Sequence, residues 1–292
     1  MTTVGFVGLG IMGGPMAVNL VKAGFDVIGH NRSPEAVQRL VEQGGRGADS
    51  LAEAVRDADV VVTMVPDSPD VEAVALAEDG IYALAKPGTI HVDMSSIRPD
   101  VARRVGEAGR QRGIRVLDAP VSGGEQGALD GTLSIMVGGD PKDFADARPI
   151  LEAVGKTIVH VGPVGSGQTV KAANQLIVAG TIELVAEAIV FLEAYGVDTE
   201  AAVAVLAGGL AGNAILERKA AGMLRRDFTP GFRIELHHKD MGIVTSAARE
   251  AGVVIPLGAV VAQLVASLKA QGDSGLDLSA LLKLVEQLSG RS

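Results

Sequence analysis

The feature that most constrains this chain is a change of pattern about halfway along it. Up to about residue 160, short β-branched runs alternate with helical stretches, which is typical of a mostly parallel sheet covered by helices on both faces. From Ser166 onward the strand patterns stop and long helical patterns follow. The short piece 162–165 is the natural boundary. We therefore expect an α/β domain over residues 1–163 and an all-helical domain over residues 164–292.

The alternating region contains seven expected strands, and expected helices fall between several of them. The strands are 4–8, 26–30, 60–65, 89–93, 115–118, 133–137 and 157–161. The clearest helices of this region are 14–23, 34–43 and 99–112. The helices expected in the second region are 166–195, 199–208, 213–225, 234–251, 256–271 and 277–288.

A glycine motif follows the first strand directly and opens the first helix. It has the form G-x-G-x-x-G and consists of Gly8, Leu9, Gly10, Ile11, Met12 and Gly13. In a strand–turn–helix context such glycines permit a tight turn and let a pyrophosphate approach the helix N-terminus. The motif predicts a Rossmann-type domain that binds a dinucleotide. The fold class is therefore α/β, with a dinucleotide-binding domain followed by a helical one.

The end of the second strand predicts which dinucleotide is bound. An enzyme that uses NAD usually has Asp or Glu there to hold the ribose 2′-hydroxyl group. This chain has Asn31, Arg32 and Ser33 instead. A guanidinium without a competing carboxylate favours a 2′-phosphate, and hence NADP(H), while NAD(H) stays possible. The alternative is that Arg32 is an exposed loop residue with no role in binding.

Lys171 is the only basic residue in a long apolar run that reaches about Phe191. At helical spacing, Asn174 and Gln175 share its face. A helix that is apolar nearly all round is buried, and a buried ammonium is costly unless it is paired, hydrogen-bonded or deprotonated. The segment thus predicts an amine that takes part in chemistry. The alternative is a lysine near the helix start that extends to solvent.

Composition excludes several classes of function. The net charge of −9 and the pI near 5.1 disfavour nucleic acid and anionic membranes as partners. The chain has no cysteine, so it has no thiol nucleophile and no cysteine-ligated metal, and we expect no metal site. No secretory signal is evident, and the apolar stretch 176–191 is interrupted by Glu183 and Glu187. We expect a soluble, cytoplasmic protein.

Four blocks of sequence resemble the β-hydroxyacid dehydrogenase family, and the resemblance runs from end to end. The blocks are the run 5–13, the Asp-Ala-Pro-Val-Ser-Gly-Gly run 118–124, the run 165–174, and Lys239-Asp240. The resemblance implies hydride transfer between a nicotinamide and a small hydroxy acid or its carbonyl counterpart.

The resemblance also implies roles for individual residues. Lys171 would be the proton donor, and Asn174 would hold the substrate and orient the lysine. The substrate carboxylate would be bound by Ser122, Gly123 and Gly124. Ser96 would lie beside the nicotinamide or substrate, and Lys239 would contact the cofactor. Phe232 and Asp240 would help to close the substrate site, and Val65 and Pro66 would line the adenine-side path of the cofactor.

Elementary chemistry supports the two central roles. Backbone N–H groups of a Ser-Gly-Gly turn just past a strand can form an anion-binding nest, although an ordinary glycine turn is the alternative. In aldehyde reduction, negative charge develops on oxygen, where an ammonium stabilises it and delivers the proton. Partial burial should lower the pKa of Lys171 toward neutrality. We interpret His237 and His238 as structural or as part of the substrate rim, because adjacent helical residues point apart.

Two details favour the tartronate semialdehyde reductase branch of the family. Gln175 follows Asn174, where 3-hydroxyisobutyrate dehydrogenases commonly have a second Asn, and the run 230–240 resembles the P-G-F-R-x-x-L-H-x-K-D form of that branch. Gln175 or Arg233 could serve the additional substrate hydroxyl. The alternatives are 3-hydroxyisobutyrate dehydrogenase, a glyoxylate or succinic semialdehyde reductase, an imine-reducing relative, and a non-catalytic nucleotide-binding scaffold. By resemblance, a homodimer or homotetramer is expected.

Overall fold

The computed structural model describes residues 1–291, which form two compact units. The first unit ends at Lys171 and the second begins at Ala172, so the division falls inside helix α9 (Ser166–Ala194). This is about two helical turns beyond the boundary expected at residue 163. The physical reason is that the first turns of α9 bond to loops of the sheet, as described below.

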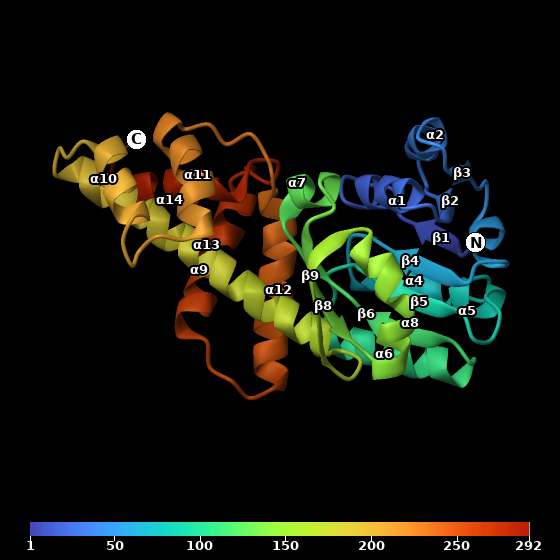
Figure 1. The fold of residues 1–292 in the computed structure, drawn as a ribbon. Coiled ribbons are helices and arrows are strands. Elements are labelled where there is room, and N and C mark those ends of the chain that lie inside the picture. Colours follow the sequence, from blue (N-terminus) through green and yellow to red (C-terminus); the bar gives the residue numbers. More distant parts are fainter. Residues whose placement is uncertain (292) are drawn as a thin grey trace. The chain divides into compact units, whose positions relative to one another are not determined.

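The first unit is built on one sheet with the order β3-β2-β1-β4-β5-β6-β8-β7, and β9 pairs with β8 (Figure 1). Neighbours from β3 to β6 are parallel, whereas β8 runs antiparallel to β6 and β7 and parallel to β9. The strands are β1 Thr3–Val7, β2 Asp26–His30, β3 Arg46–Gly47, β4 Val60–Thr63, β5 Ile90–Asp93, β6 Arg115–Asp118, β7 Val121–Ser122, β8 Leu133–Gly138 and β9 Gly155–Gly162.

Eight helices of the first unit are described. They are α1 Gly13–Lys22, α2 Pro34–Glu42, α3 Leu51–Val55, α4 Ser68–Leu76, α5 Ile81–Leu84, α6 Pro99–Gln111, α7 Gly124–Leu129 and α8 Pro141–Glu152. Successive strand residues face opposite sides of the sheet, so one strand feeds two cores. In β4, Val60 and Val62 join a core with α1, α2 and α8, while Val61 joins another with α3 to α6. Helices therefore cover both faces, as expected.

All seven expected strands form, with ends shifted by a few residues at most. Two strands were not expected, namely β3 and β7, and each has only two residues. Arg46 and Gly47 of β3 are exposed and polar or small, so no apolar alternation marks them. Strand β7 lies in the Ser-Gly-Gly turn and is held by its antiparallel pairing with β8.

The second unit is helical throughout its described residues, as expected. After α9 it contains α10 Thr199–Ala207, α11 Ala214–Arg225, α12 Ile234–Glu250, α13 Pro256–Ala270, the 3₁₀ turn Leu278–Ala280 and α14 Leu281–Leu288. One face of α9, including Ala179, Ile182 and Ile189, packs with α11, α12, α13 and α14 in a single core. The buried members of this core on α9 run from Ala172 to Val190.

Helix α9 is the one described helix that is long and apolar enough to cross a membrane by length and composition alone. From the sequence no such stretch was expected, because Glu183 and Glu187 interrupt the apolar run, but two charges leave the helix apolar overall. About 44% of its most apolar window is buried inside the structure.

Candidate functional site

The glycine motif forms a tight loop between β1 and α1. Gly8 has φ +99°, and a Cβ there would lie 2.2 Å from the Met64 carbonyl oxygen. A Cβ on Gly13 would lie 1.9 Å from the carbonyl oxygen of Gly8. Gly13 therefore lets the loop close on itself, and Gly8 lets the loop approach the backbone that follows β4. A Cβ on Gly10 would meet no described atom within 4 Å, so the Gly10 backbone faces open space.

The surroundings of this loop fit a dinucleotide. The first turn of α1 contains no acidic residue, and its N-terminus has no side-chain cap among the described residues. Backbone N–H groups at such a helix start favour an anion. The Leu9 N–H donates to Asn31 Oδ1 over 3.0 Å, so Asn31 holds the loop in place from the end of β2. The open backbone at Gly10 is where a pyrophosphate would fit.

The selector, the segment 31–33 that is expected to choose between NAD(H) and NADP(H), lies just after β2. Arg32 and Ser33 are both exposed, and the Ser33 hydroxyl donates to Glu35 in the first turn of α2. That hydrogen bond keeps the pKa of Glu35 below its ordinary value, so the carboxylate is ionised at neutral pH. The selector thus exposes the Arg32 guanidinium, and the Glu35 carboxylate lies beside Ser33.

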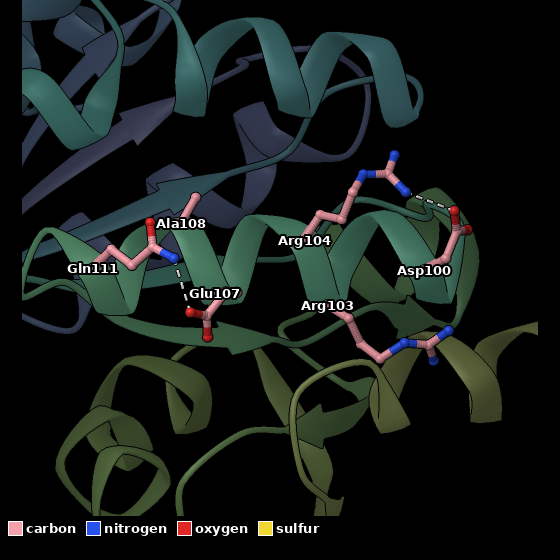
Figure 2. A pocket seen from close by; sticks show the side chains of 6 residues that line it. All are labelled: Asp100, Arg103, Arg104, Glu107, Ala108 and Gln111. Atoms are coloured by element: carbon pink, nitrogen blue, oxygen red, sulfur yellow. Dashed lines mark hydrogen bonds and ion pairs between the residues drawn. The ribbon is translucent and has the colours of Figure 1, made fainter.

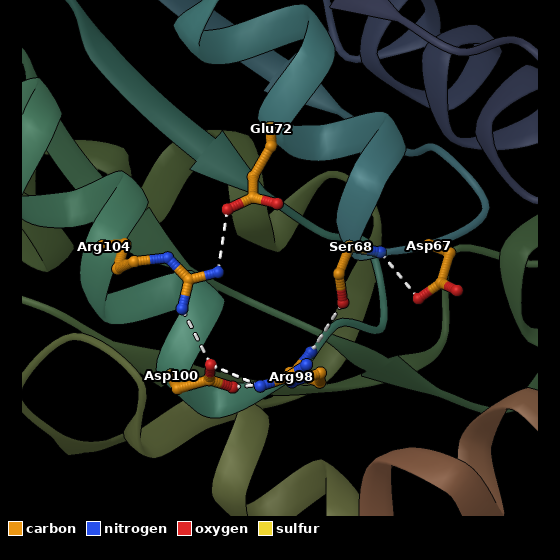
Figure 3. Close-up of polar contacts among 6 residues, drawn as sticks. All are labelled: Asp67, Ser68, Glu72, Arg98, Asp100 and Arg104. Atoms are coloured by element: carbon orange, nitrogen blue, oxygen red, sulfur yellow. Dashed lines mark hydrogen bonds and ion pairs between the residues drawn. The ribbon is translucent and has the colours of Figure 1, made fainter.

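Side-chain hydroxyls join the loops that follow β4 and β5. The Val65 N–H donates to Ser95 Oγ over 3.0 Å, and the Arg98 N–H donates to Ser68 Oγ over 3.1 Å. Figure 3 shows the second of these bonds. Ser96 is half-buried between the two. Parallel strands β4 and β5 end at the same sheet edge, so these loops lie where open α/β sheets bind ligands.

A buried network of polar side chains lies behind these loops. The Thr63 hydroxyl donates to Asp93 Oδ1 over 2.7 Å, and the Ser95 N–H donates to the same oxygen over 3.2 Å. His91 lies between Thr63 Oγ1 at 3.0 Å and the Tyr82 hydroxyl at 2.8 Å. Burial lowers the pKa of His91 to about 4, so the ring is neutral. The network fixes the sheet edge and was not expected from the sequence.

The Ser-Gly-Gly turn has the backbone that an anion nest requires. Ser122 ends β7 and pairs with Ser134, while Gly123 and Gly124 have φ values of +144° and +68°. Residues with a Cβ rarely adopt either conformation. A Cβ on Gly124 would meet no described atom within 4 Å, so this backbone is also accessible. The turn therefore leaves the Gly124 backbone accessible to a ligand.

Asp118, at the end of β6, anchors the start of α9. Its Oδ1 accepts from the Gly165 N–H over 2.7 Å, and its Oδ2 accepts from the Gln168 N–H over 2.9 Å. Burial raises the pKa of Asp118 to about 6, although these two hydrogen bonds oppose the rise. Close approach depends on Gly167, where a Cβ would lie 2.3 Å from the Met136 carbonyl oxygen.

Gln168 joins the same helix to the loop after β5. It is 1% exposed, its Oε1 accepts from the Ile97 N–H over 3.0 Å, and its Nε2 donates to the Ser95 carbonyl over 2.8 Å. Lys171 follows three residues later and is 9% exposed, so it is not at the surface. Asp118 and Gln168 were not predicted from the sequence as site residues. The one available signal was the position of Gln168 one turn before Lys171.

Within the second unit, four predicted residues form a polar chain. The Asn174 side-chain NH₂ donates to Gln175 Oε1 over 2.7 Å, and Gln175 Nε2 donates to Asp240 Oδ2 over 2.6 Å. Lys239 Nζ lies 3.0 Å from Asp240 Oδ1. This last contact is an ion pair rather than a well-directed hydrogen bond, since Asp240 Oδ1 has no partner with hydrogen-bond geometry among the described residues. Asn174 is three residues beyond Lys171 on α9.

The two histidines of α12 differ in surroundings. His237 is fully buried and its ring packs edge-on against Phe232, with centroids 5.9 Å apart. His238 is partly exposed, and its Nδ1 lies 3.4 Å from Lys269 Nζ. The burial and ring contact of His237 indicate a structural role, in agreement with one of the two interpretations from the sequence.

A shallow pocket on α6 is not part of this set. Figure 2 shows its lining, which comes from α6 alone: Asp100, Arg103, Arg104, Glu107, Ala108 and Gln111. Arg104 bridges Asp100 and Glu72 at 2.8 Å each, and Arg98 pairs with Asp100 (Figure 3). These exposed pairs link α6 to α4. Acidic and basic groups neutralise each other here, so the pocket offers no field of one sign to a ligand.

Comparison with known proteins matches both units. Residues 3–162 match the NAD binding domain of 6-phosphogluconate dehydrogenase, and residues 165–285 match the family described as NAD-binding of NADP-dependent 3-hydroxyisobutyrate dehydrogenase. The chain is 42% identical to 2-hydroxy-3-oxopropionate reductase of Escherichia coli K12, covering 98% of each protein. It is 40% identical to 3-hydroxyisobutyrate dehydrogenase of Pseudomonas aeruginosa, covering 97% of this chain and 98% of the relative.

Solved structures show the same fold. The structure of 3-hydroxyisobutyrate dehydrogenase from Mycobacterium tuberculosis with L-serine has a TM-score of 0.89 at 36% identity, covering 98% of this chain and 99% of that one. The chain therefore belongs to the β-hydroxyacid dehydrogenase family of NAD(P)-dependent oxidoreductases.

Proposed function

We propose that this protein reduces tartronate semialdehyde (2-hydroxy-3-oxopropionate) to D-glycerate, with NADPH as the favoured reductant and Lys171 as the proton donor. The observation that carries the proposal is the placement of Lys171. It is buried on α9, one turn from Asn174, on a helix whose start is bonded to the loop that holds Ser96. An amine that is buried at such a sheet edge is suited to proton transfer.

When bound, the nicotinamide supplies the hydride that reduces the aldehyde carbon. Lys171 would stabilise the negative charge that develops on the substrate oxygen and would transfer its proton there, leaving a neutral amine that regains a proton from water. Ser122, Gly123 and Gly124 would hold the substrate carboxylate through the accessible backbone of their turn. The products are then the hydroxy acid and the oxidised cofactor.

Asn174 is the proposed partner of both the substrate and Lys171. Its NH₂ group is directed to Gln175, which leaves its Oδ1 as the end that can accept a proton from an ammonium or a hydroxyl. Being uncharged, the amide orients the lysine without raising the lysine pKa as a carboxylate would. Phe232, Lys239 and Asp240 retain their expected roles in substrate and cofactor binding as predictions.

Two observations support the tartronate semialdehyde branch. One is the 42% identity to the E. coli reductase over nearly the whole of both chains. The other is the Gln175 amide, which bridges Asn174 and Asp240. An Asn at this position would be one methylene shorter and could not span both partners in the same way. Gln175 would therefore act on the substrate hydroxyl through Asn174 rather than by direct contact.

The preference for NADP(H) is proposed from the selector. Arg32 is exposed just after β2, and positions 31 to 33 hold Asn, Arg and Ser in place of the acidic residue by which NAD enzymes hold the 2′-hydroxyl; the nearest carboxylate described, that of Glu35, is bonded to the Ser33 hydroxyl. Arg32→Ala should raise KM for NADPH by about ten- to a hundredfold, the usual value of a charge-assisted phosphate contact. KM for NADH should change little. Equal effects on both cofactors would contradict the assignment.

We also propose that the protein is a homodimer or homotetramer. Ile177, Leu184 and Phe191 recur every seven residues along α9 and are 68%, 60% and 61% exposed. Heptad spacing places them in one stripe, which suits pairing with the same stripe of a second copy. A cytoplasmic location stays a prediction.

The deciding experiment compares initial rates with tartronate semialdehyde, 3-hydroxyisobutyrate, glyoxylate, succinic semialdehyde and L-serine, each with both cofactors in the matching redox form. A clear lead in kcat/KM for tartronate semialdehyde with NADPH is expected. A lead for 3-hydroxyisobutyrate with NAD would place the protein in the other branch and leave the Lys171 mechanism intact. Lys171→Ala should lower kcat about 10²- to 10⁴-fold with any of them, which separates an enzyme from a nucleotide-binding scaffold.

A further inference from the structure

We propose that Gln168 is a positioning residue that sets the distance between the Ser96 loop and Lys171, and so aligns the hydride and proton transfers. The inference rests on the proposed function, because it needs Lys171 to be the proton donor. Gln168 itself has no part in the chemistry. Its side chain bonds to backbone groups on both sides of Ser96 and to nothing that reacts.

The geometry is a two-point clamp. Gln168 Oε1 accepts from the Ile97 N–H over 3.0 Å, while its Nε2 donates to the Ser95 carbonyl over 2.8 Å. The two partners flank Ser96 in the chain, so the peptide groups on either side of Ser96 are both fixed to α9. A carboxamide accepts at its oxygen and donates at its nitrogen at the same time, as these two partners require.

The clamp and Lys171 belong to the same rigid element. Lys171 is three residues beyond Gln168, and this stretch of helix is itself fixed because Asp118 accepts hydrogen bonds from the Gly165 and Gln168 N–H groups. A displacement of the Ser96 loop relative to α9 would therefore change its distance from Lys171 directly. Such displacements matter, since a shift of about 1 Å in a reacting geometry can cost about a hundredfold in rate.

Burial argues that the side chain is retained for this arrangement. Gln168 is 1% exposed, and a buried carboxamide without both partners would cost free energy of folding. An apolar residue of similar size could fill the same volume without that risk, but it could not hold the peptides around Ser96. The polar side chain thus gives the loop a defined position as well as filling space.

The test uses Gln168→Leu and Gln168→Glu, with Thr89→Val as the matched control. Glu keeps the size and the acceptor for Ile97 but cannot donate to the Ser95 carbonyl when ionised. Thr89 is also buried and bonds to the Ala58 carbonyl, but it precedes β5, at the end of the strand remote from Ser96. Melting temperature, the dissociation constant for NADPH, and kcat and KM are measured for each protein.

We expect Gln168→Leu to lower kcat by about ten- to a hundredfold, with Gln168→Glu in between. The dissociation constant for NADPH should change by less than about threefold, since the glycine loop and selector are intact. Thr89→Val should lose thermal stability without losing kcat. A loss of kcat in the control as large as that in Gln168→Leu would show that general destabilisation explains both, and would overturn the proposal. Wild-type kcat in Gln168→Leu would do the same.

A double mutant tests whether Gln168 acts through Lys171. If it does, adding Gln168→Leu to Lys171→Ala should reduce kcat by much less than it does in the wild-type background. Fully multiplicative effects would contradict the proposal. The same variants distinguish a failure of the proposed function from a failure of the positioning role of Gln168. Wild-type kcat in Lys171→Ala would refute the proposed function, whereas a slow Lys171→Ala beside a fully active Gln168→Leu would refute only the positioning role.

Discussion

Glu183 provides the sharpest quantitative test of the packing of α9. Its side chain is 6% exposed in the helical core, and its Oε2 has no hydrogen-bond partner among the described residues. Burial, followed by repulsion from Glu187, raises the pKa of Glu183 from about 4.5 to about 7. In the unfolded chain the carboxyl regains its ordinary pKa, so ionisation favours unfolding.

The sign and size follow from proton linkage. Because the pKa is higher in the folded protein, the folded state binds more protons, and stability falls as pH rises from about 4.5 to about 7. At about 1.4 kcal/mol for each pH unit over which only the unfolded state is ionised, the loss between pH 5 and pH 8 is about 2.5 kcal/mol. Above pH 8 the contribution of this residue is constant.

Glu183→Gln removes the ionisation and keeps the shape. Urea unfolding is measured at pH 5 and pH 8, at one protein concentration. Between pH 5 and pH 8, the free energy of unfolding of wild type should fall by about 2 to 3 kcal/mol more than that of Glu183→Gln. Glu187→Gln is the control, because Glu187 is exposed one turn further along the same helix and should shift stability by less than about 0.5 kcal/mol. An unchanged pH dependence in Glu183→Gln would refute the reasoning.

Three other outcomes follow from the structure. Gly10→Ala should weaken NADPH binding about tenfold or more without lowering the melting temperature, whereas Gly13→Ala should lower both, as titration and thermal melts will show. Asp118→Asn should lower kcat about tenfold. It should also remove a fall in kcat below about pH 6, because in wild type the protonation of Asp118 weakens its hydrogen bonds to the start of α9. The same fall in the variant would contradict this. Leu184→Glu should yield a smaller particle in light scattering, while Leu129→Glu should not; Leu129 is 50% exposed on the first unit, against 60% for Leu184.

Sequence reasoning could determine what is local in the chain. The G-x-G-x-x-G motif lies within one strand–turn–helix unit, and in the structure Gly13 closes that loop against the Gly8 carbonyl. The strands and helices follow from hydrophobic period, which also predicted the change to an all-helical second unit. Strands β3 and β7 escaped prediction because two residues carry no period. The placement of Lys171 among buried residues was likewise foreseen from the apolar run around it.

The tertiary structure decided which distant residues meet. Gln168 bonds to partners more than 70 positions earlier in the chain, and Asp118 bonds to α9 about 50 positions later. No local period reports such pairings, because they arise where separate strands end at the same edge of the sheet. The boundary between the units falls inside α9 for the same reason. Those long-range bonds hold the start of α9 in the first unit, although its sequence is that of one uninterrupted helix.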